Sequence, residues 1–192
     1  MPRTNRKQQI LEAFVIMLET NPGGRITTAA LAKEVGVSEA ALYRHFPSKA
    51  KMIDGLLDFA EQSVFTRITA VLEAEQEIEP RCYQIVHLLL AFVEKNPGFA
   101  RLLAGDALQG ETDRLRARVK QFFDRIEMQL RQIIREHQAN AIQRPEFSAN
   151  DVANLLLSCA EGKIMQFVRS DFKALPSSSF PQHWSVLKQA LR

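Results

Sequence analysis

A short stretch near the N-terminus combines residues that bind anions with residues small enough to approach a surface closely. In "SEAALYRHFPSK", Ser38, Glu39 and Ala40 are followed one helical turn later by Tyr43 and Arg44. Small or polar side chains at the start of a helix let its backbone enter the DNA major groove, about 12 Å wide. A phenol and a guanidinium one turn later can reach the flanking phosphates. The pattern therefore predicts recognition of a nucleic acid and not catalysis.

Neighbouring residues extend this predicted contact surface. Thr27 and Thr28 precede a helix whose free N–H groups can hold a phosphate together with a hydroxyl. Glu39 can accept from a cytosine amino group, and the methyl group of Ala40 can touch a thymine methyl. The predicted nucleic-acid contacts are Arg3, Lys7, Thr27, Thr28, Val37, Ser38, Glu39, Ala40, Tyr43, Arg44 and Lys49.

The charge distribution agrees with this interpretation. The whole chain of 192 residues carries a formal charge of only +3. Residues 1–51 contain eight Lys or Arg and four acids, which gives +4 and leaves −1 for the remainder. A basic end on an otherwise balanced chain is typical of a unit that binds a polyanion, although a solvated basic face would give the same count.

The elements that must position these residues are three short helices joined by turns. Apolar residues with helical spacing predict a helix over 5–20, and "NPGG" at 21–24 ends it. Thr27 or Thr28 can cap a second helix over 28–35, which Gly36 stops, and Ser38 can cap a third that ends before Pro47. Two short helices joined by a turn of this kind predict a helix-turn-helix unit.

The rest of the chain also reads as helical, with no convincing strand pattern. Further helices are predicted over 48–76, 80–95, 97–104, 112–138, 148–171 and 180–191. On helix 112–138 we expect Arg114, Arg118, Arg125 and Arg131 to be solvated. The sequence thus predicts an all-α protein with a helix-turn-helix domain at 1–51 and a larger helical domain for dimerisation and partner binding at 52–192.

Composition narrows the class of protein. With 46% hydrophobic and 24% charged residues the chain is an ordinary globular one, and it contains no apolar run of about 18 residues that would span a membrane. We expect no signal peptide, since Glu12 interrupts the first apolar stretch. Cys82 and Cys159 lack metal-ligand spacing and are expected to be reduced thiols in the cytoplasm. No nucleophile, phosphate or metal signature is present, so we expect neither an enzyme nor a cofactor or metal site.

Two stripes on the fourth and fifth predicted helices form a second candidate site. Phe59, Ser63 and Arg67 share one helix face, and Leu88, Ala91 and Lys95 share another. If the two helices pack side by side, an apolar trough closed by cations results, which suits an extended and partly acidic peptide. Asn96 follows at the end of the second stripe. The alternative is that Phe59 and Leu88 are ordinary core residues.

The N-terminal segment resembles the DNA-binding region of TetR-family transcriptional regulators. In that family a turn of V-G-V-S type leads into a recognition helix ending Y-x-H-F, followed by x-S-K, and each part is present here at 35–38, 43–46 and 48–49. The resemblance implies an α-helical homodimer that binds a palindromic DNA operator. Within this fold, a repressor released by a small molecule in the C-terminal domain is one possible function.

A longer resemblance covers nearly the whole chain. "KNPGFARLLAGDAL", "QLRQIIRE" and "CAEGKIMQFVRSDFK" are similar to the nucleoid occlusion factors of gammaproteobacteria. This resemblance implies a cytoplasmic, nucleoid-associated protein that binds chromosomal sites and antagonises the tubulin-like division protein FtsZ, whose C-terminal tail would be the peptide partner.

The resemblance also places the dimer interface on the last two long segments. The implied interface residues are Leu155, Leu156, Cys159, Gly162, Phe167 and Trp184. The alternative is that these apolar residues form a core within one chain. Dimerisation matters because two recognition helices must lie about 34–36 Å apart to read successive major grooves.

Overall fold

The computed structural model describes residues 5–141 and 145–191, and every regular element in these two ranges is helical. The N-terminal unit contains α1 (Arg6–Thr20), α2 (Thr28–Val35) and α3 (Glu39–His45). The larger unit contains α4 (Lys49–Ala74), α5 (Ile78–Lys95), α6 (Pro97–Leu103), η1 (Asp106–Leu108), α7 (Asp113–Ala139), α8 (Ala149–Arg169), α9 (Phe180–Leu187) and η2 (Lys188–Leu191). The predicted all-α architecture, a helix-turn-helix unit followed by a larger helical unit, is confirmed.

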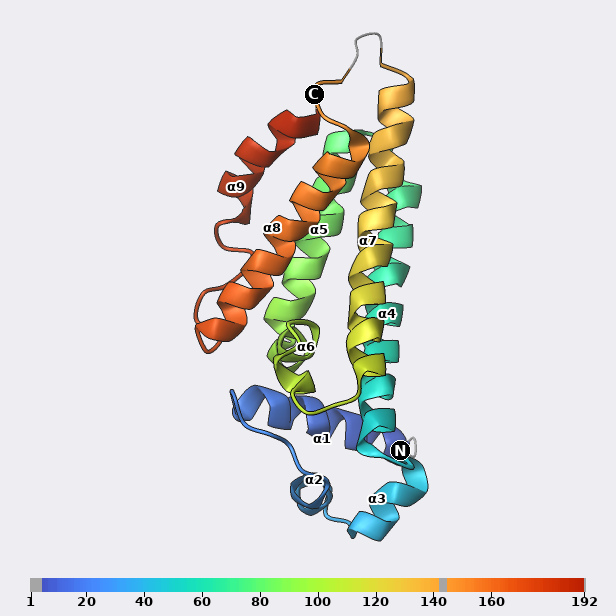
Figure 1. Cartoon of the computed structure of the whole chain (residues 1–192), viewed down its shortest axis with the longest axis vertical. Coiled ribbons are helices and arrows are strands. Elements are labelled where there is room, and N and C mark those ends of the chain that lie inside the picture. Colours follow the sequence, from blue (N-terminus) through green and yellow to red (C-terminus); the bar gives the residue numbers. More distant parts are fainter. Residues whose placement is uncertain (1–4, 142–144, 192) are drawn as a thin grey trace.

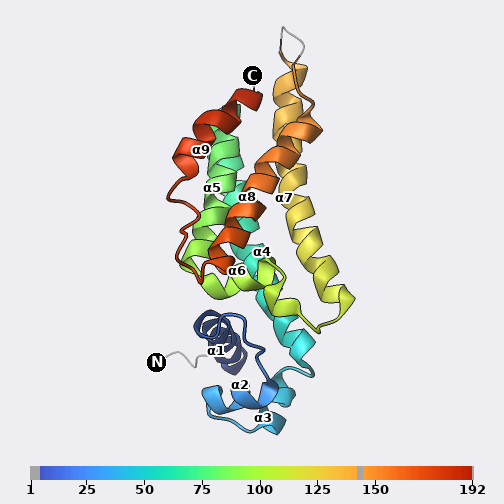
Figure 2. The ribbon, with the colours of Figure 1, turned by 60° about the vertical axis from the view of Figure 1, so that its left-hand side comes forward.

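The long helices form a bundle with the small unit at one end (Figure 1). Helices α4, α5, α7 and α8 run along the long axis of the molecule, and α1, α2 and α3 lie below them. The turned view in Figure 2 keeps α2 and α3 at the far end, away from the bundle. None of the helices in the described ranges combines the length and the apolar character that crossing a bilayer needs.

The helix-turn-helix geometry is set by local caps. The hydroxyl of Thr27 accepts a hydrogen bond from Ala30 N–H at 3.1 Å, and that of Ser38 accepts from Ala41 N–H at 3.1 Å. Between the two helices Gly36 has φ +73°, a left-handed conformation that glycine adopts without strain. The sequence signals that predicted these two helices are therefore the ones that begin and end them.

Two predicted segments differ from the observed helices. The expected helix over 180–191 is α-helical only to Leu187 and continues as the 3₁₀ turn η2. The expected pause at 105–110 contains the 3₁₀ turn η1, bracketed by Gly105 and Gly110, which both have positive φ. Glycine adopts this left-handed conformation without strain at both ends of the segment.

One hydrophobic core runs through both units. Ile10, Phe14 and Leu18 of α1 are buried in the same cluster as the apolar faces of the bundle helices. The contact between α1 and α6 is close, because a Cβ on Gly98 would lie 2.4 Å from the carbonyl oxygen of Val15. The small unit is thus packed directly onto the bundle.

A buried arginine fixes this joint. The Arg101 side chain on α6 is 2% exposed. Its guanidinium donates to the carbonyl oxygens of Leu18 (2.8 Å), Asn21 (2.6 Å) and Gly24 (3.2 Å), and its Nε donates to Asp106 at 2.5 Å. Helix ends leave carbonyls without intrahelical partners, and Arg101 supplies these partners at the end of α1 and in the following turn.

A second charged cluster joins α4 to α7. Arg114 donates two hydrogen bonds of 2.8 Å to the carboxylate of Asp54, and Arg118 donates another at 3.1 Å. Burial by itself raises the pKa of Asp54, but the bonds from Arg114 and Arg118 outweigh burial and bring the pKa below its ordinary value. Asp54 is therefore ionised and paired in the folded protein.

The expectation that the α7 arginines are solvated was wrong for Arg118, whose side chain is 20% exposed, whereas Arg114 and Arg125 are each 51% exposed and also contact α4. Besides its bond to Asp54, Arg118 donates to Asp58 and Glu61, both at 2.8 Å. The guanidinium of Arg125 lies 3.7 Å from the ring centroid of Phe65. These side chains are occupied because α4 presents acids and an aromatic ring toward α7, and residues 57 to 64 positions apart in the chain meet there.

We expect Arg101→Leu to destabilise the protein by about 3–5 kcal/mol, since it leaves three carbonyls and Asp106 without their buried partner. Urea unfolding followed by circular dichroism measures the loss. Arg116→Leu is the matched control, because the ion pair that Arg116 forms with Asp113 lies on the surface. Equal losses of unfolding free energy in the two variants would contradict a stabilising role of Arg101 at the joint between the two units.

The lowered pKa of Asp54 predicts a pH dependence of stability. The stabilisation is fully present above the unfolded pKa of about 4 and is lost as pH falls through the lower folded pKa. The difference in free energy of unfolding between the wild type and Asp54→Asn should therefore shrink between about pH 5 and pH 2. A difference in unfolding free energy between the wild type and Asp54→Asn that is constant across this pH range would contradict the lowered pKa of Asp54.

Candidate functional site

The tip of the small unit exposes the residues predicted to read a nucleic acid. Ser38, Glu39, Ala40, Tyr43 and Arg44 are all exposed on α3. The opposite face of the helix is anchored in the core by Leu42. Helix α3 lies at the end of the molecule furthest from the bundle (Figure 1). A helix held on one side and free on the other can enter a groove without unfolding.

A hydrogen-bonded chain links α3 to the start of α2. The hydroxyl of Thr28 donates to a carboxylate oxygen of Glu39 at 3.0 Å, and the Tyr43 hydroxyl donates to Thr28 at 3.2 Å. These contacts set the side chains of Glu39 and Tyr43 before any ligand arrives. If Glu39 contacts a base, its carboxylate must do so while it also accepts the hydrogen bond from Thr28. The spacing of residues in the sequence did not predict this hydrogen bond.

The other residues predicted to contact a nucleic acid lie outside this set of hydrogen bonds. Thr27 is exposed, and because its oxygen already accepts the capping bond, its hydroxyl proton remains available to a phosphate. Lys7 is exposed on α1 and lies 5.8 Å from the ring centroid of Phe46. Val37 is half-buried against the core. Arg3 lies outside the described residues.

Lys49 has a partner that the sequence did not predict. Its Nζ lies 2.7 Å from a carboxylate oxygen of Glu111, with side chains 19% and 11% exposed. Glu111 lies between η1 and α7, so the larger unit holds a cation that we expected to be free for a phosphate. A nucleic acid that contacts Lys49 must share it with Glu111 or displace Glu111.

The second predicted site forms a hollow between α4 and α5. All seven predicted residues, together with His87 and Phe92, line a cavity of about 360 Å³. Phe59 is 44% exposed, so it is not an ordinary core residue, whereas Leu88 is half-buried against the core. The seven residues are Phe59, Ser63, Arg67, Leu88, Ala91, Lys95 and Asn96.

Charge is placed at the edges of this hollow. Arg67 and Lys95 are exposed, and neither forms an ion pair within the described part of the chain. Asn96 is held in place by donating to the carbonyl of Phe92 at 2.7 Å. His87, which sequence reasoning missed, precedes Ala91 by one helical turn and stacks on Tyr83 with ring centroids 5.5 Å apart. Extending the α5 stripe by one turn would have found it.

The predicted dimer residues separate into two groups. Leu155 is 46% exposed, and Cys159 and Gly162 also lie on the outer part of α8. Leu156, Phe167 and Trp184 are buried within the chain, so their placement at a dimer surface was wrong. Leu156 and Phe167 face inward because α5, α6 and α7 pack against that side of α8, and Trp184 of α9 packs against Tyr83 of α5. Met165, three residues after Gly162, is exposed and belongs to the outer stripe.

The surroundings of the two cysteines do not favour their thiolate forms. Burial raises the pKa of Cys82 to about 12, and burial also raises the pKa of Cys159, so neither thiol is activated as a thiolate. Within residues 5–141 and 145–191, no group of three His, Cys, Asp or Glu side chains is arranged to hold a metal ion.

The pairing of Lys49 predicts the effect of Glu111→Gln on nucleic-acid binding. Removing the competing carboxylate should tighten binding and increase the slope of log affinity against log salt by up to about one unit. Lys49→Ala should weaken binding to all sequences and reduce that slope by about one. Fluorescence anisotropy with a labelled duplex at several salt concentrations measures both. If Glu111→Gln still tightens binding in the Lys49→Ala background, the effect does not run through Lys49.

Family models match both parts of the chain. Residues 10–56 match the bacterial regulatory proteins of the TetR family, and residues 76–192 match the tetracyclin repressor-like C-terminal domain of SlmA-like type. A nucleoid occlusion factor SlmA from Marinomonas sp. strain MWYL1 is 54% identical over 189 residues, which covers 98% of this chain and 96% of that protein. The protein of the same name from Shewanella pealeana is 52% identical over 190 residues, with 99% and 96% covered.

Solved structures with low sequence identity share the fold. The fatty acid degradation regulator FadR from Bacillus halodurans superimposes with a TM-score of 0.82 at 14% identity, covering 100% of this chain and 99% of that one. The MbdR regulator from Azoarcus sp. CIB gives 0.80 at 18% identity, with 95% and 97% covered. This chain therefore belongs to the TetR family and, within it, to the nucleoid occlusion factors named SlmA.

Proposed function

We propose that this protein acts as a nucleoid occlusion factor that binds chromosomal DNA through α3 and captures the C-terminal tail of FtsZ in the hollow between α4 and α5. Bound to DNA, it would antagonise FtsZ assembly and block septum formation over the nucleoid. The protein would act in the cytoplasm, associated with the nucleoid, as a non-catalytic adaptor that needs no cofactor.

The exposed tip of the small unit supports the DNA-binding part of this proposal. Five predicted contact residues on α3 and its N-cap are exposed, and the first 51 residues carry a formal charge of +4. Phosphate contacts by Tyr43, Lys49 and the N-terminus of α2 would fix the register, while Glu39 and Ala40 would read base edges. Membership of a DNA-binding family of dimeric regulators supports the same conclusion.

The hollow between α4 and α5, which forms the peptide groove, supports the FtsZ tail as the partner. It is the main observation behind the proposal. Two stripes chosen from helical spacing line one hollow, in a chain whose relatives are named for nucleoid occlusion. The exposed ring of Phe59 offers an apolar anchor, and Arg67 and Lys95 offer cations for an acidic peptide. Exposed apolar groups ringed by charge are typical of a surface for a protein partner.

A dimer would complete the DNA-binding unit. We propose that the outer stripe of α8, with Leu155, Cys159, Gly162 and Met165, meets the same stripe of a second copy. Nothing lies within 4 Å of a Cβ built on Gly162, so this position leaves room for a partner helix. A symmetric pair of α3 helices would then read a palindromic operator.

We propose that the division of function between residues 1–51 and 52–192 falls inside one continuous helix. Helix α4 runs from Lys49 to Ala74 across this boundary. Its first turn carries the predicted phosphate contact Lys49, and its middle carries Phe59, Ser63 and Arg67. The nucleic-acid contact and the peptide groove would therefore share one rigid element.

Arg67→Glu tests the proposal. It should reduce affinity for a labelled FtsZ C-terminal tail peptide at least about tenfold, because a carboxylate that repels an acidic peptide replaces the cation at the groove edge. Binding to a duplex selected by this protein from a random pool should be unchanged. Arg135→Glu is the matched control, since Arg135 is exposed on α7 outside the residues that line the groove.

The readouts are fluorescence anisotropy for the peptide and a gel-shift assay for the duplex. Full tail binding by Arg67→Glu would overturn the groove assignment. Loss of both peptide and duplex binding, with an unchanged unfolding midpoint, would show that the two sites overlap and would contradict the separate sites proposed here.

A further inference from the structure

Two adjacent threonines at the start of α2 use their hydroxyl groups differently. The Thr27 oxygen accepts the capping bond from Ala30 N–H, so its proton is free for an acceptor outside the chain. The Thr28 hydroxyl donates to Glu39 at 3.0 Å and accepts from the Tyr43 hydroxyl at 3.2 Å. A hydroxyl has a single proton, and that of Thr28 is already used inside the helix-turn-helix unit.

The side chain of Glu39 depends on Thr28 for its orientation. Glu39 is exposed in the first turn of α3. Within the described residues its carboxylate accepts a side-chain hydrogen bond from Thr28 alone and forms no ion pair. An exposed glutamate without such a contact samples many rotamers, because its side chain is long and flexible. The Thr28 hydroxyl therefore restricts the carboxylate to the side of α3 that faces the start of α2.

Tyr43 completes a series of hydrogen bonds that runs in one direction. It lies one helical turn after Glu39 on α3 and is 41% exposed. A carboxylate can only accept, so the Thr28 proton points to Glu39 and the Tyr43 proton points to Thr28. The buried side chain of Leu42 anchors α3 in the core beside these bonds. The position of the Glu39 carboxylate is therefore set by both helices of the helix-turn-helix unit.

A carboxylate held in one position can distinguish base pairs by repulsion as well as by attraction. It accepts a hydrogen bond from the amino group of cytosine, whereas guanine and thymine present acceptor oxygens in the major groove. A mobile carboxylate can turn away from such an acceptor and avoid the repulsion, but a held carboxylate cannot. Repulsion of the wrong partner is a general source of specificity.

We propose that Thr28 is a specificity-determining residue that acts by positioning Glu39, and that it is not a phosphate contact. The inference rests on the proposed function, since it takes a DNA operator as the ligand of α3. Thr28 then controls how strongly the protein discriminates at the base pair opposite Glu39, without touching that base pair itself.

Thr28→Val tests this inference, because valine keeps the branched shape of threonine and removes the hydroxyl. The full-length wild type and Glu39→Ala first select duplexes from a random pool, which identifies the base pair where Glu39→Ala loses preference. In one half-site that base pair is then changed so that an acceptor oxygen replaces the amino group. The specificity ratio is the affinity for the selected duplex divided by that for the changed duplex, measured by fluorescence anisotropy at one salt concentration.

Thr28→Val should lower the specificity ratio at least about threefold. Most of the change should be tighter binding of the changed duplex, because the released carboxylate can turn away from the acceptor. Thr28→Ser keeps a hydroxyl and should stay within about twofold of the wild type. In the Glu39→Ala background, Thr28→Val should not lower the ratio further, since the effect acts through Glu39.

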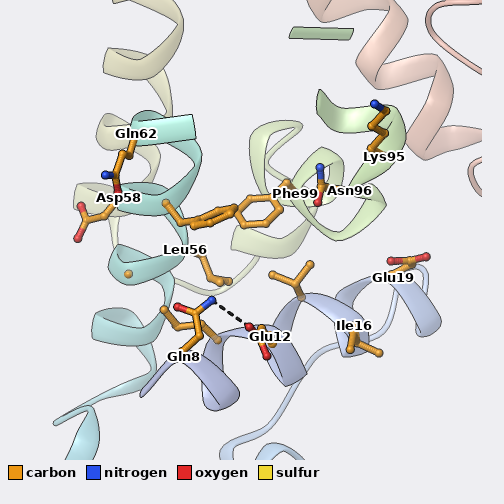
Figure 3. Close-up of a pocket in the computed structure, with 14 residues that line it drawn as sticks. Gln8, Glu12, Ile16, Glu19, Leu56, Asp58, Gln62, Lys95, Asn96 and Phe99 are labelled. Atoms are coloured by element: carbon orange, nitrogen blue, oxygen red, sulfur yellow. Dashed lines mark hydrogen bonds between the residues drawn. The ribbon is translucent and has the colours of Figure 1, made fainter. Parts of the chain in front are cut away.

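Gln8→Met is the matched control, and Figure 3 shows the hydrogen bond that it removes. The amide of Gln8 donates to Glu12 at 3.0 Å, the same length as the bond from Thr28 to Glu39. Both residues lie on α1 and line a hollow whose lining in the described chain includes no residue of α3. Gln8→Met should therefore leave the specificity ratio unchanged. Unfolding midpoints of all variants show whether the fold is intact.

The outcomes separate this inference from the proposed function. If Thr28→Val weakens binding of both duplexes alike and leaves the ratio within about twofold, Thr28 is a phosphate contact and the inference is wrong, but DNA binding stands. If Glu39→Ala keeps the wild-type preference at every base pair, Glu39 reads no base and the inference is also wrong. If the wild type itself selects no duplex from the pool, the proposed function fails with it.

Discussion

The buried guanidinium of Arg101 is the contact on which the joint between the two units depends. It supplies partners for carbonyls at the end of α1 and in the turn that follows, and Asp106 balances its charge. Burying such a charge is costly unless every donor is used. Gly98 adds the close approach of α6 to α1. The orientation of α1, and of the α2–α3 unit packed on it, is therefore fixed relative to the bundle.

Helix α4 carries this fixed orientation from one site to the other. Its first turn places Lys49 beside Glu111, its second places Asp54 between two arginines of α7, and its middle places Phe59 in the hollow between α4 and α5. A helix held by an ion-pair network along one side cannot rotate or slide without losing those pairs. The proposed nucleic-acid face and the proposed peptide groove are thus joined by one rigid helix.

This packing divides the arginines and lysines into two classes, those paired within the fold and those left unpaired on the surface. Arg114 and Arg118 are held by acids of α4, and Arg101 by backbone carbonyls, so these cations serve the fold. Arg67 and Lys95 are exposed and form no ion pair within the described chain, so these cations remain available to a ligand. Among the exposed apolar side chains, Phe59 lies in the hollow between α4 and α5, and Leu155 and Met165 lie on the outer stripe of α8. Net charge and composition do not distinguish these classes.

The sequence by itself determined the helices, the caps at Thr27 and Ser38, and the two stripes of the groove. These features depend on spacing within a few residues, which is a local property of a helix. Only the tertiary structure decided that Leu156, Phe167 and Trp184 face the chain's own core, since an apolar stripe does not reveal which neighbour covers it. The pair Lys49–Glu111 spans 62 positions, and Arg101 reaches carbonyls about 80 positions away. Contacts of that range are set by how whole helices pack, and helical periodicity carries no record of them.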